Sequence, residues 1–194
     1  MFRKKFKDKD LLWLIDTIVD SMEGDKGLAI GSLFSQWGGN FYLTYFDHWT
    51  KEEKKIKYYY RYCDDVVILH ESKEFLHNLR LDIEEYLKVN LDLKLKENYQ
   101  VFPTKIRGID FVGYRHFGDY ILLRKTTAKN FKRKMRNILN KCKSGKEMSY
   151  SEWCSINSYK GWVMYCNGFN LTKKYINPLT PYVNEYYRKN IKKG

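Results

Sequence analysis

The sequence has few prolines and cysteines, and it lacks the motifs of several large protein classes. Three prolines in 194 residues leave no obvious flexible linker. The four cysteines (Cys63, Cys142, Cys154 and Cys166) form no CxxC pair, which argues against a zinc site and fits reduced thiols in the cytoplasm. No glycine-rich phosphate loop is present. No run approaches the roughly 18 apolar residues of a membrane span, and no stretch has a signal-peptide pattern, so we expect a cytoplasmic chain without a membrane partner.

Acidic side chains are scarce in the second half of the chain. Residues 1–100 contain 16 basic and 18 acidic side chains, whereas residues 101–194 contain 20 and 5. The net charge of +13 therefore arises from the second half. Such an excess predicts a polyanionic partner, a nucleic acid, bound by the C-terminal part. A charged surface that only keeps the chain in solution is the alternative.

Hydrophobic periodicity predicts a mixture of helices and short strands. Helical periods cover residues 10–21 with Asp10 as a possible N-cap, residues 33–49, and residues 72–89 with Ser72 as the cap. The other expected elements are strands at 58–62, 66–70, 91–101, 106–114 and 119–123, and helices at 126–143, 149–167 and 178–191. This order predicts an α+β fold, with a sheet domain over residues 1–123 and a basic helical domain over residues 124–194.

Two adjacent carboxylates lie between two of the predicted strands. Asp64 and Asp65 separate the runs 58–62 and 66–70, and because two carboxylates are not buried unpaired, we expect a hairpin whose turn carries both. Paired carboxylates on a rigid turn suit Mg²⁺ that also binds phosphate oxygens, and such a site is compatible with two-metal phosphoryl transfer. A solvated hairpin tip without a metal is the alternative interpretation.

Four segments occur in the order found in one enzyme family. They are Ile30-Gly31-Ser32-Leu33-Phe34-Ser35-Gln36, Tyr62-Cys63-Asp64-Asp65, Phe111-Val112-Gly113-Tyr114 and Ser158-Tyr159-Lys160-Gly161-Trp162. Together they resemble reverse transcriptases (RNA-directed DNA polymerases) of bacterial and phage retroelements, in which the second segment corresponds to the YxDD box. The resemblance implies a partial polymerase palm, an antiparallel sheet with packed helices, followed by an all-helical basic thumb.

The resemblance also implies roles for individual residues. Asp64 and Asp65 would bind two Mg²⁺ ions, or Mn²⁺ in their place, during transfer of nucleotides from dNTPs to a primer or cDNA on template RNA. The residues expected to contact nucleotide or template are Ile30, Gly31, Ser35, Gln36, Tyr62 and Cys63. The residues expected to form the primer grip are Phe111, Gly113 and Tyr114. Helix capping by Ser35 and a structural thiol at Cys63 are the alternatives for those two positions.

Two positions of the first segment distinguish subfamilies. Ile30 and Gln36 stand where most intron-type enzymes have Gln and Pro, and this form resembles the reverse transcriptases of diversity-generating retroelements. The resemblance implies error-prone copying of a template RNA together with a basic accessory variability protein. A group II intron-like reverse transcriptase or maturase is the alternative.

The family also requires a further Asp on a strand upstream of the helix expected at 10–21. No β-rich run with an Asp precedes Asp10, and Asp16 and Asp20 lie within the helical pattern. We therefore expect an N-terminally truncated enzyme that is inactive alone. A non-catalytic remnant that binds RNA or an RNA–DNA hybrid is the rival reading.

Lysines and arginines recur at helical spacing in the expected thumb. The residues that this spacing brings near one face are Lys125, Lys129, Lys132, Arg133 and Arg136. Such a ladder of positive charge predicts contact with a nucleic-acid backbone. Farther upstream, Lys94 or Lys96 is a candidate to protonate the leaving pyrophosphate, with solvated lysines as the alternative.

Overall fold

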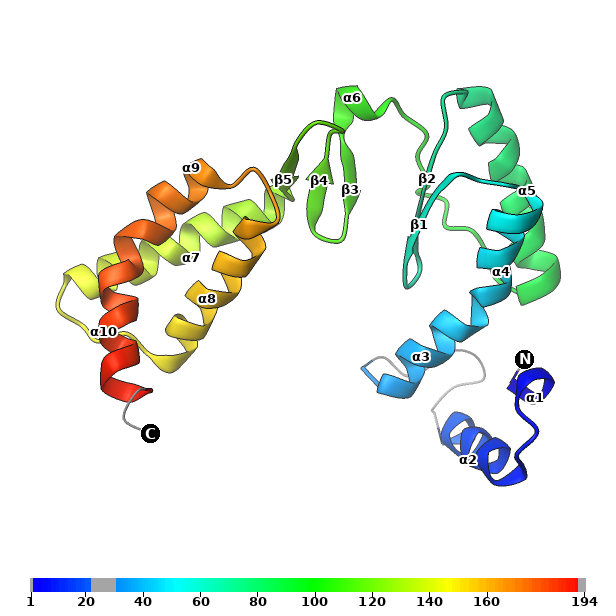
Figure 1. Cartoon of the computed structure of the whole chain (residues 1–194), viewed down its shortest axis with the longest axis horizontal. Coiled ribbons are helices and arrows are strands. Elements are labelled where there is room, and N and C mark those ends of the chain that lie inside the picture. Colours follow the sequence, from blue (N-terminus) through cyan, green and yellow to red (C-terminus); the bar gives the residue numbers. More distant parts are fainter. Residues whose placement is uncertain (1, 22–30, 192–194) are drawn as a thin grey trace. The chain divides into compact units, whose positions relative to one another are not determined.

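The structure is a computed structural model that describes residues 2–21 and 31–191. The chain divides into two compact units, Met1–Val101 and Phe102–Gly194, and each is described here by itself. Both units combine helices with a small antiparallel sheet, so the chain is α+β as the sequence predicts (Figure 1). Within the described ranges, every helix is too short or too polar to cross a bilayer.

The first unit places a two-stranded hairpin against helices. Its elements are α1 (Phe2–Lys5), α2 (Lys9–Asp20), α3 (Leu33–Tyr42), α4 (Thr44–His48), the π-helical turn η1 (Trp49–Glu53), β1 (Tyr58–Tyr62), β2 (Asp65–Leu69) and α5 (Lys73–Leu91). Strands β1 and β2 pair antiparallel from Tyr58 opposite Leu69 to Tyr62 opposite Asp65, which confirms the predicted hairpin. Its inner side packs with α4 and one face of α5 around the buried Phe46.

Local signals explain where most of these helices begin and end. The Ser72 side chain accepts a hydrogen bond from the Phe75 amide, which confirms the predicted cap of α5. Helix α2 is capped by Asp8 and not by Asp10, which lies in its first turn. The helix expected over 33–49 is interrupted at Leu43 and continues as α4 and a π-helical turn.

The strand expected over residues 91–101 is wrong. Leu91 is the last residue of α5 and is buried with Leu87 and Ile83, because these positions continue the helical period of that face. Asp92 then adopts a left-handed conformation with φ of 49° and ends the helix. The alternating leucines that follow it belong to a segment without regular secondary structure.

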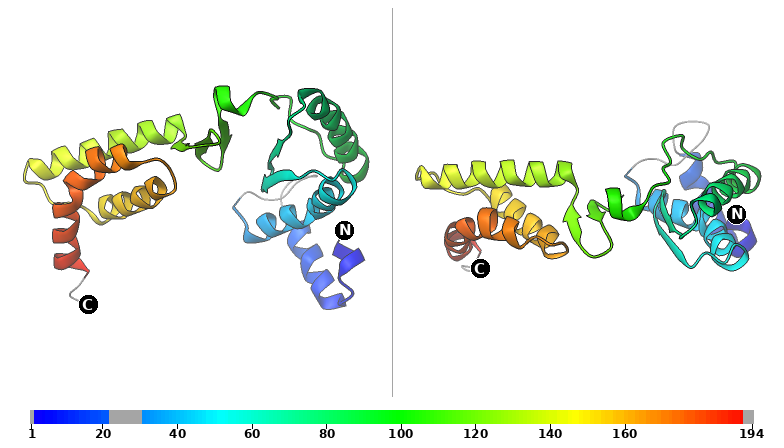
Figure 2. Two further views of the ribbon diagram at one scale, coloured as in Figure 1. Left: turned by 45° about the horizontal axis from the view of Figure 1, so that its top comes forward. Right: turned by 90° about the horizontal axis from the view of Figure 1, so that it is seen from above.

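The second unit combines a three-stranded sheet with a bundle of helices. Its elements are α6 (Thr104–Arg107), β3 (Ile109–Phe111), β4 (Tyr114–His116), β5 (Ile121–Leu123), α7 (Lys125–Lys143), α8 (Tyr150–Met164), α9 (Phe169–Leu171), the π-helical turn η2 (Thr172–Ile176), the 3₁₀ turn η3 (Asn177–Leu179) and α10 (Thr180–Asn190). The sheet order is β3-β4-β5, with antiparallel pairs, where the sequence predicted two strands, at 106–114 and 119–123. The turn η2 lies against both α7 and α8 (Figure 2).

The three-stranded sheet shares a core with the helices that follow it. Leu123 of β5 is buried together with Phe131 and Met135 of α7, and Tyr114 of β4 packs against the same cluster. The division between compact units therefore falls before this sheet, at residues 101 and 102, whereas the sequence-based boundary falls after it, at residues 123 and 124.

Candidate functional site

The two adjacent carboxylates lie at the end of the β1–β2 hairpin. Cys63 and Asp64 form the two-residue turn, and Asp65 is the first residue of β2, paired with Tyr62. Asp65 thus lies on the strand, whereas the sequence predicted that the turn would carry both carboxylates. Cys63 has a left-handed φ of 52°, which is unfavourable for a residue with a side chain. All four residues from Tyr62 to Asp65 are exposed, so ions and nucleotides can reach the two carboxylates.

The Lys96 ammonium lies directly in front of Asp64. Lys96 Nζ is 2.7 Å from Asp64 Oδ2, and both side chains are about 70% exposed. The hydrogen bond from Lys96 lowers the pKa of Asp64, and a backbone hydrogen bond adds to the effect. The same hydrogen bond and the charge of Asp64 raise the pKa of Lys96, to which the charge of Asp65 also contributes. One cation position therefore receives the field of both carboxylates.

The carboxylates of Asp64 and Asp65 can be compared with the ligands that a metal ion needs. The Lys96 ammonium lies 2.7 Å from Asp64 Oδ2, so a positive group is held beside this carboxylate, and the charge of Asp65 makes a smaller favourable contribution. Two hard carboxylates suit one Mg²⁺ that keeps several waters. Among the described residues, no group of three or more His, Cys, Asp or Glu side chains gathers around a common point. The two carboxylates are fewer protein ligands than a two-ion site needs.

A polar network attaches the turn to α3 and α4. Arg61 forms a two-point ion pair with Asp47, through Nε at 2.7 Å and Nη2 at 2.5 Å, and its side chain is 11% exposed. Arg61 Nη1 donates to Asn40 Oδ1 and to the Cys63 carbonyl, both at 2.9 Å. The Tyr59 hydroxyl donates to Asp47 Oδ1. Burial opposes ionisation of Asp47, but the hydrogen bonds from Arg61 and Tyr59 outweigh it and lower the pKa of Asp47.

Three of the residues expected to contact nucleotide or template, Gly31, Ser35 and Gln36, lie at or just before the start of α3, whereas Tyr62 and Cys63 lie on the β1–β2 hairpin. Gly31 is exposed with φ of +92°, Ser32 precedes the helix, and Gln36 is exposed in its first turn. The Ser35 hydroxyl is buried and has no hydrogen-bond partner among the described residues. Ile30 lies outside the described residues. Helix α3 reaches the acidic turn through Asn40, one helical turn beyond Gln36, and no hydrogen bond among the described residues joins Gln36 itself to that turn.

The residues expected to form the primer grip pack against α8. Val112 and Gly113 connect β3 to β4 with φ of 48° and 81°, the type I′ pattern of a two-residue hairpin. A Cβ at Gly113 would lie 2.5 and 2.8 Å from atoms of the Trp162 ring. Tyr114 stacks on Trp162 with ring centroids 5.6 Å apart, and its hydroxyl donates to the Trp162 carbonyl at 3.0 Å. The FVGY and SYKGW segments thus contact each other, while Phe111 lies on β3 opposite Tyr114.

The basic ladder lies on one side of α7. Because α7 is continuous from Lys125 to Lys143, its helical period keeps the five expected residues within an arc of about 100°. The turn η2 adds two exposed lysines that the sequence analysis did not select, Lys173 and Lys174. Arg136 and Lys174 both lie over the Tyr175 ring, at 5.3 and 5.9 Å from its centroid. We call Lys125, Lys129, Lys132, Arg133, Arg136, Lys173 and Lys174 the basic face.

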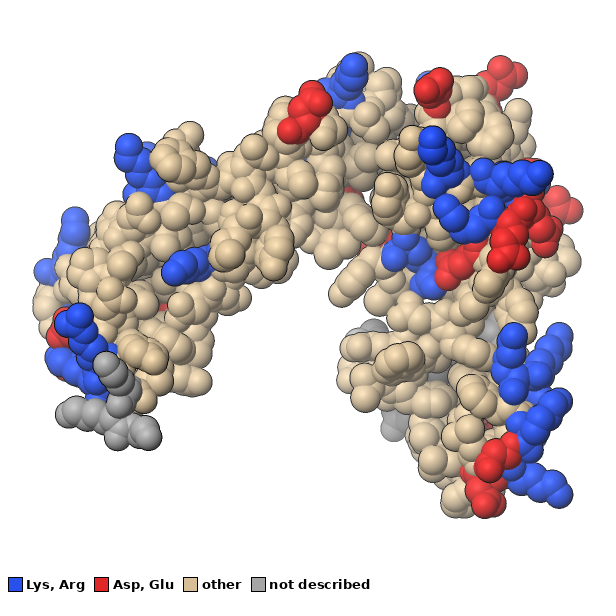
Figure 3. Space-filling model, viewed as in Figure 1, with Lys and Arg blue, Asp and Glu red and all other residues tan. Residues whose placement is uncertain are grey.

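The basic face is not neutralised within the unit. Three of the five acidic residues of the second half pair elsewhere, Asp110 with Arg124, Glu152 with Lys141 and Glu185 with Lys189. In the part of the chain that the structure describes, no residue of the basic face forms an ion pair. On the face shown in Figure 3, basic side chains are spread over the helices of this unit and acidic ones are few.

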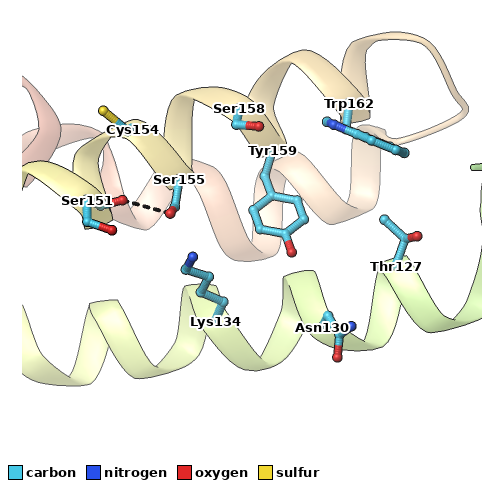
Figure 4. Close-up of a pocket in the computed structure, with 9 residues that line it drawn as sticks. All are labelled: Thr127, Asn130, Lys134, Ser151, Cys154, Ser155, Ser158, Tyr159 and Trp162. Carbon is cyan, nitrogen blue, oxygen red and sulfur yellow. Dashed lines mark hydrogen bonds between the residues drawn. The ribbon is translucent and has the colours of Figure 1, made fainter. Parts of the chain in front are cut away.

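A polar groove of about 550 Å³ runs between α7 and α8. Its walls include Thr127 and Lys134 on α7 and three serines and Trp162 on α8, with no acidic side chain among the lining residues. Figure 4 shows Lys134 pointing from α7 toward Ser155, which itself donates a hydrogen bond to the Ser151 carbonyl. Helical geometry puts Lys134 and Thr127 roughly opposite Lys132 on α7, so the groove and the basic face are separate surfaces.

Comparisons with known proteins add no family assignment. No protein-family model matches the chain, and no curated protein matches it.

The sequence did not indicate two of the groups that organise the acidic turn. Arg61 and Asp47 are ordinary charged residues in the sequence, and only the tertiary contacts join them to the turn. Lys96 was a candidate proton donor, but its pairing with Asp64 was not predicted. Lys173 and Lys174 lie in a π-helical turn, which has no reliable signature in composition.

Proposed function

We propose that this chain is the palm and thumb portion of an RNA-directed DNA polymerase of the retroelement type, with nucleic acid bound by its basic second unit. The observation that carries the proposal is the YCDD hairpin, where one cation position is exposed to the field of both Asp64 and Asp65. The order of the four family-like segments along the chain supports it.

In this proposal the residues of the turn bind and orient the ion. Asp64 is the principal ligand because it extends from the turn itself, and Asp65 contributes from the strand beside it. Mg²⁺ bound there supplies activation of a primer 3′-hydroxyl and neutralises charge on the triphosphate. Lys96 leaves Asp64 when the ion binds, which costs little because an exposed ion pair is worth about 0–1 kcal/mol.

The subtype of the proposed enzyme rests on two residues. Ile30 and Gln36 favour a diversity-generating retroelement, with template RNA and a basic accessory protein as partners, over a group II intron-like enzyme. Gln36 is exposed at the start of α3, where a nucleotide or template can reach it.

A second function is favoured by one specific observation. The acidic turn has two carboxylates, fewer than a two-ion site needs, while no residue of the basic face forms an ion pair among the described residues. A protein with these features binds RNA or an RNA–DNA hybrid without chemistry. The two proposals differ in whether metal at Asp64 and hybrid at the basic face stabilise each other.

Hybrid binding measured with and without Mg²⁺ separates the two functions. In the polymerase proposal, about 5 mM Mg²⁺ at constant ionic strength tightens binding of the RNA–DNA hybrid about fivefold, which is the low end of the coupling usually seen between two binding sites. Asp64→Asn abolishes this gain. In the binding proposal, Mg²⁺ has the same effect on the wild type and on Asp64→Asn. If neither the wild type nor Asp64→Asn binds the RNA–DNA hybrid, both proposals are refuted.

The salt dependence of binding tests the basic face. Replacing Lys129, Lys132 and Arg133 by Gln should reduce the slope of log affinity against log salt by about two to three, because each charge releases nearly one counterion. The charge-matched control replaces Lys4, Lys7 and Lys9, which are exposed in the first unit. Equal slopes for the two triple variants would show that total charge, and not the basic face, determines binding.

A further inference from the structure

Arg61 uses all three nitrogens of its guanidinium in contacts within the first unit. Nε and Nη2 bind the two carboxylate oxygens of Asp47, and Nη1 donates to Asn40 and to the Cys63 carbonyl. The side chain is 11% exposed, which makes this contact set the least solvated ion pair found among the described residues. A guanidinium so constrained has a fixed plane, and Nη1 is therefore held in one direction.

The Cys63 carbonyl is the group whose direction matters for the acidic turn. It belongs to the peptide bond that links Cys63 to Asp64, so its orientation fixes the plane of that peptide bond and the position of the Asp64 Cα. Cys63 has φ of 52°, a left-handed conformation that is unfavourable for a residue with a side chain. A two-residue turn with such strain needs a contact that stabilises it, and the hydrogen bond from Arg61 is positioned to provide one.

The same nitrogen connects the turn to α3. Asn40 lies four residues after Gln36, so both lie on one side of that helix. The last turn of α3 and the acidic turn are thus joined through one guanidinium, which is itself held by Asp47 of α4.

We propose that Arg61 is a positioning residue that holds the Cys63–Asp64 peptide, and with it the Asp64 carboxylate, in the orientation that binds a divalent cation. The inference rests on the proposed function only for the identity of the ion. If the role of Arg61 were limited to its ion pair with Asp47, Arg61 would stabilise the first unit but would not affect the conformation of the turn.

Arg61→Lys separates these two roles. A lysine retains a positive charge beside Asp47, but its single ammonium cannot bind Asp47 at two points and also reach Cys63 and Asn40. The matched control is Tyr59→Phe, which removes a hydrogen bond to the same Asp47 oxygen; among the described residues, the Tyr59 hydroxyl forms no hydrogen bond with the turn.

Two readouts on the full chain test the proposal. Amide hydrogen exchange by NMR reports the turn, and electron paramagnetic resonance with Mn²⁺ as the probe reports the cation position. We expect Arg61→Lys to raise exchange at residues 63–65 about tenfold and to weaken Mn²⁺ binding at least threefold, whereas Tyr59→Phe changes neither, even if it lowers the Tm. Equal effects of the two variants on both readouts would overturn the proposal.

Asn40→Ala provides a second variant if Arg61→Lys does not fold. Asn40 is exposed, and its loss removes one acceptor of Nη1 while the Asp47 pair remains. Exchange at residues 63–65 should rise about threefold, and no rise would contradict the inference. If wild-type protein binds Mn²⁺ no better than Asp64→Asn, the proposed metal function fails, while the exchange measurement still decides the role of Arg61.

Discussion

Replacing Gly113 by Ala should destabilise the second unit more than any comparable glycine substitution in its sheet. Two costs add at this position. The φ of +81° costs an alanine roughly 1–2 kcal/mol. The new Cβ would also lie 2.5 Å from the Trp162 ring, and such overpacking costs about 1–3 kcal/mol. The ring cannot simply turn away, because it stacks on Tyr114.

The sum is about 2–5 kcal/mol, which corresponds to a fall in Tm of about 10 °C or more for a unit of this size. Thermal unfolding followed by circular dichroism measures the fall, and hydrogen exchange over residues 109–123 assigns it to this unit. Gly118→Ala is the matched control, because Gly118 has φ of +91° and no atom within 4 Å of a Cβ. It carries only the conformational cost.

A double-mutant cycle isolates the contact itself. In a Trp162→Leu background the Cβ at position 113 meets no ring, so Gly113→Ala should cost no more than Gly118→Ala. Equal destabilisation by the two alanines in the wild-type background would refute the packing of the FVGY turn on α8.

Two further predictions concern the first unit. Lys96→Met should strengthen Mn²⁺ binding, by less than about fivefold because the pair is exposed, whereas Lys94→Met leaves it unchanged; weaker binding would show that Lys96 assists the ion. Because the folded-state pKa of Asp47 is lowered, its stabilisation is complete above the ordinary value of 3.8 and is lost as the pH falls through the folded value. The free energy of unfolding in urea should therefore fall more steeply below about pH 4 for the wild type than for Asp47→Asn. If the two proteins lose stability in parallel as the pH falls, Asp47 does not have this role.

Much of the fold follows from local sequence patterns. The β-branched and aromatic runs beside the acidic pair predict the β1–β2 hairpin, and Ser72 marks the start of α5. The strand expected after Leu91 failed because alternating leucines coincided with the last turn of a helix whose period is set by tertiary burial. The break at Leu43 and the π-helical turns have no comparable local signal.

The candidate sites were predictable to the same extent. Adjacent acids between two strands are sufficient to place Asp64 at the end of a hairpin, and helical spacing is sufficient to place the lysines of α7 on one side. Contacts across long stretches of sequence are not predictable in this way. The Lys96 ammonium joins Asp64 from 32 positions away, and Asp47 reaches Arg61 from 14 positions away.

Titration of the full chain with Mn²⁺, observed by electron paramagnetic resonance, tests the central claim most directly. We expect the wild type to bind one ion, Asp64→Asn to weaken binding about tenfold or more, and Asp65→Asn to weaken it less, because Asp65 contributes from the strand. Asp82→Asn is the control, since Asp82 is an acid of the same unit that pairs with Lys54. Equal binding by all four proteins would contradict the assignment of the YCDD turn as a metal site.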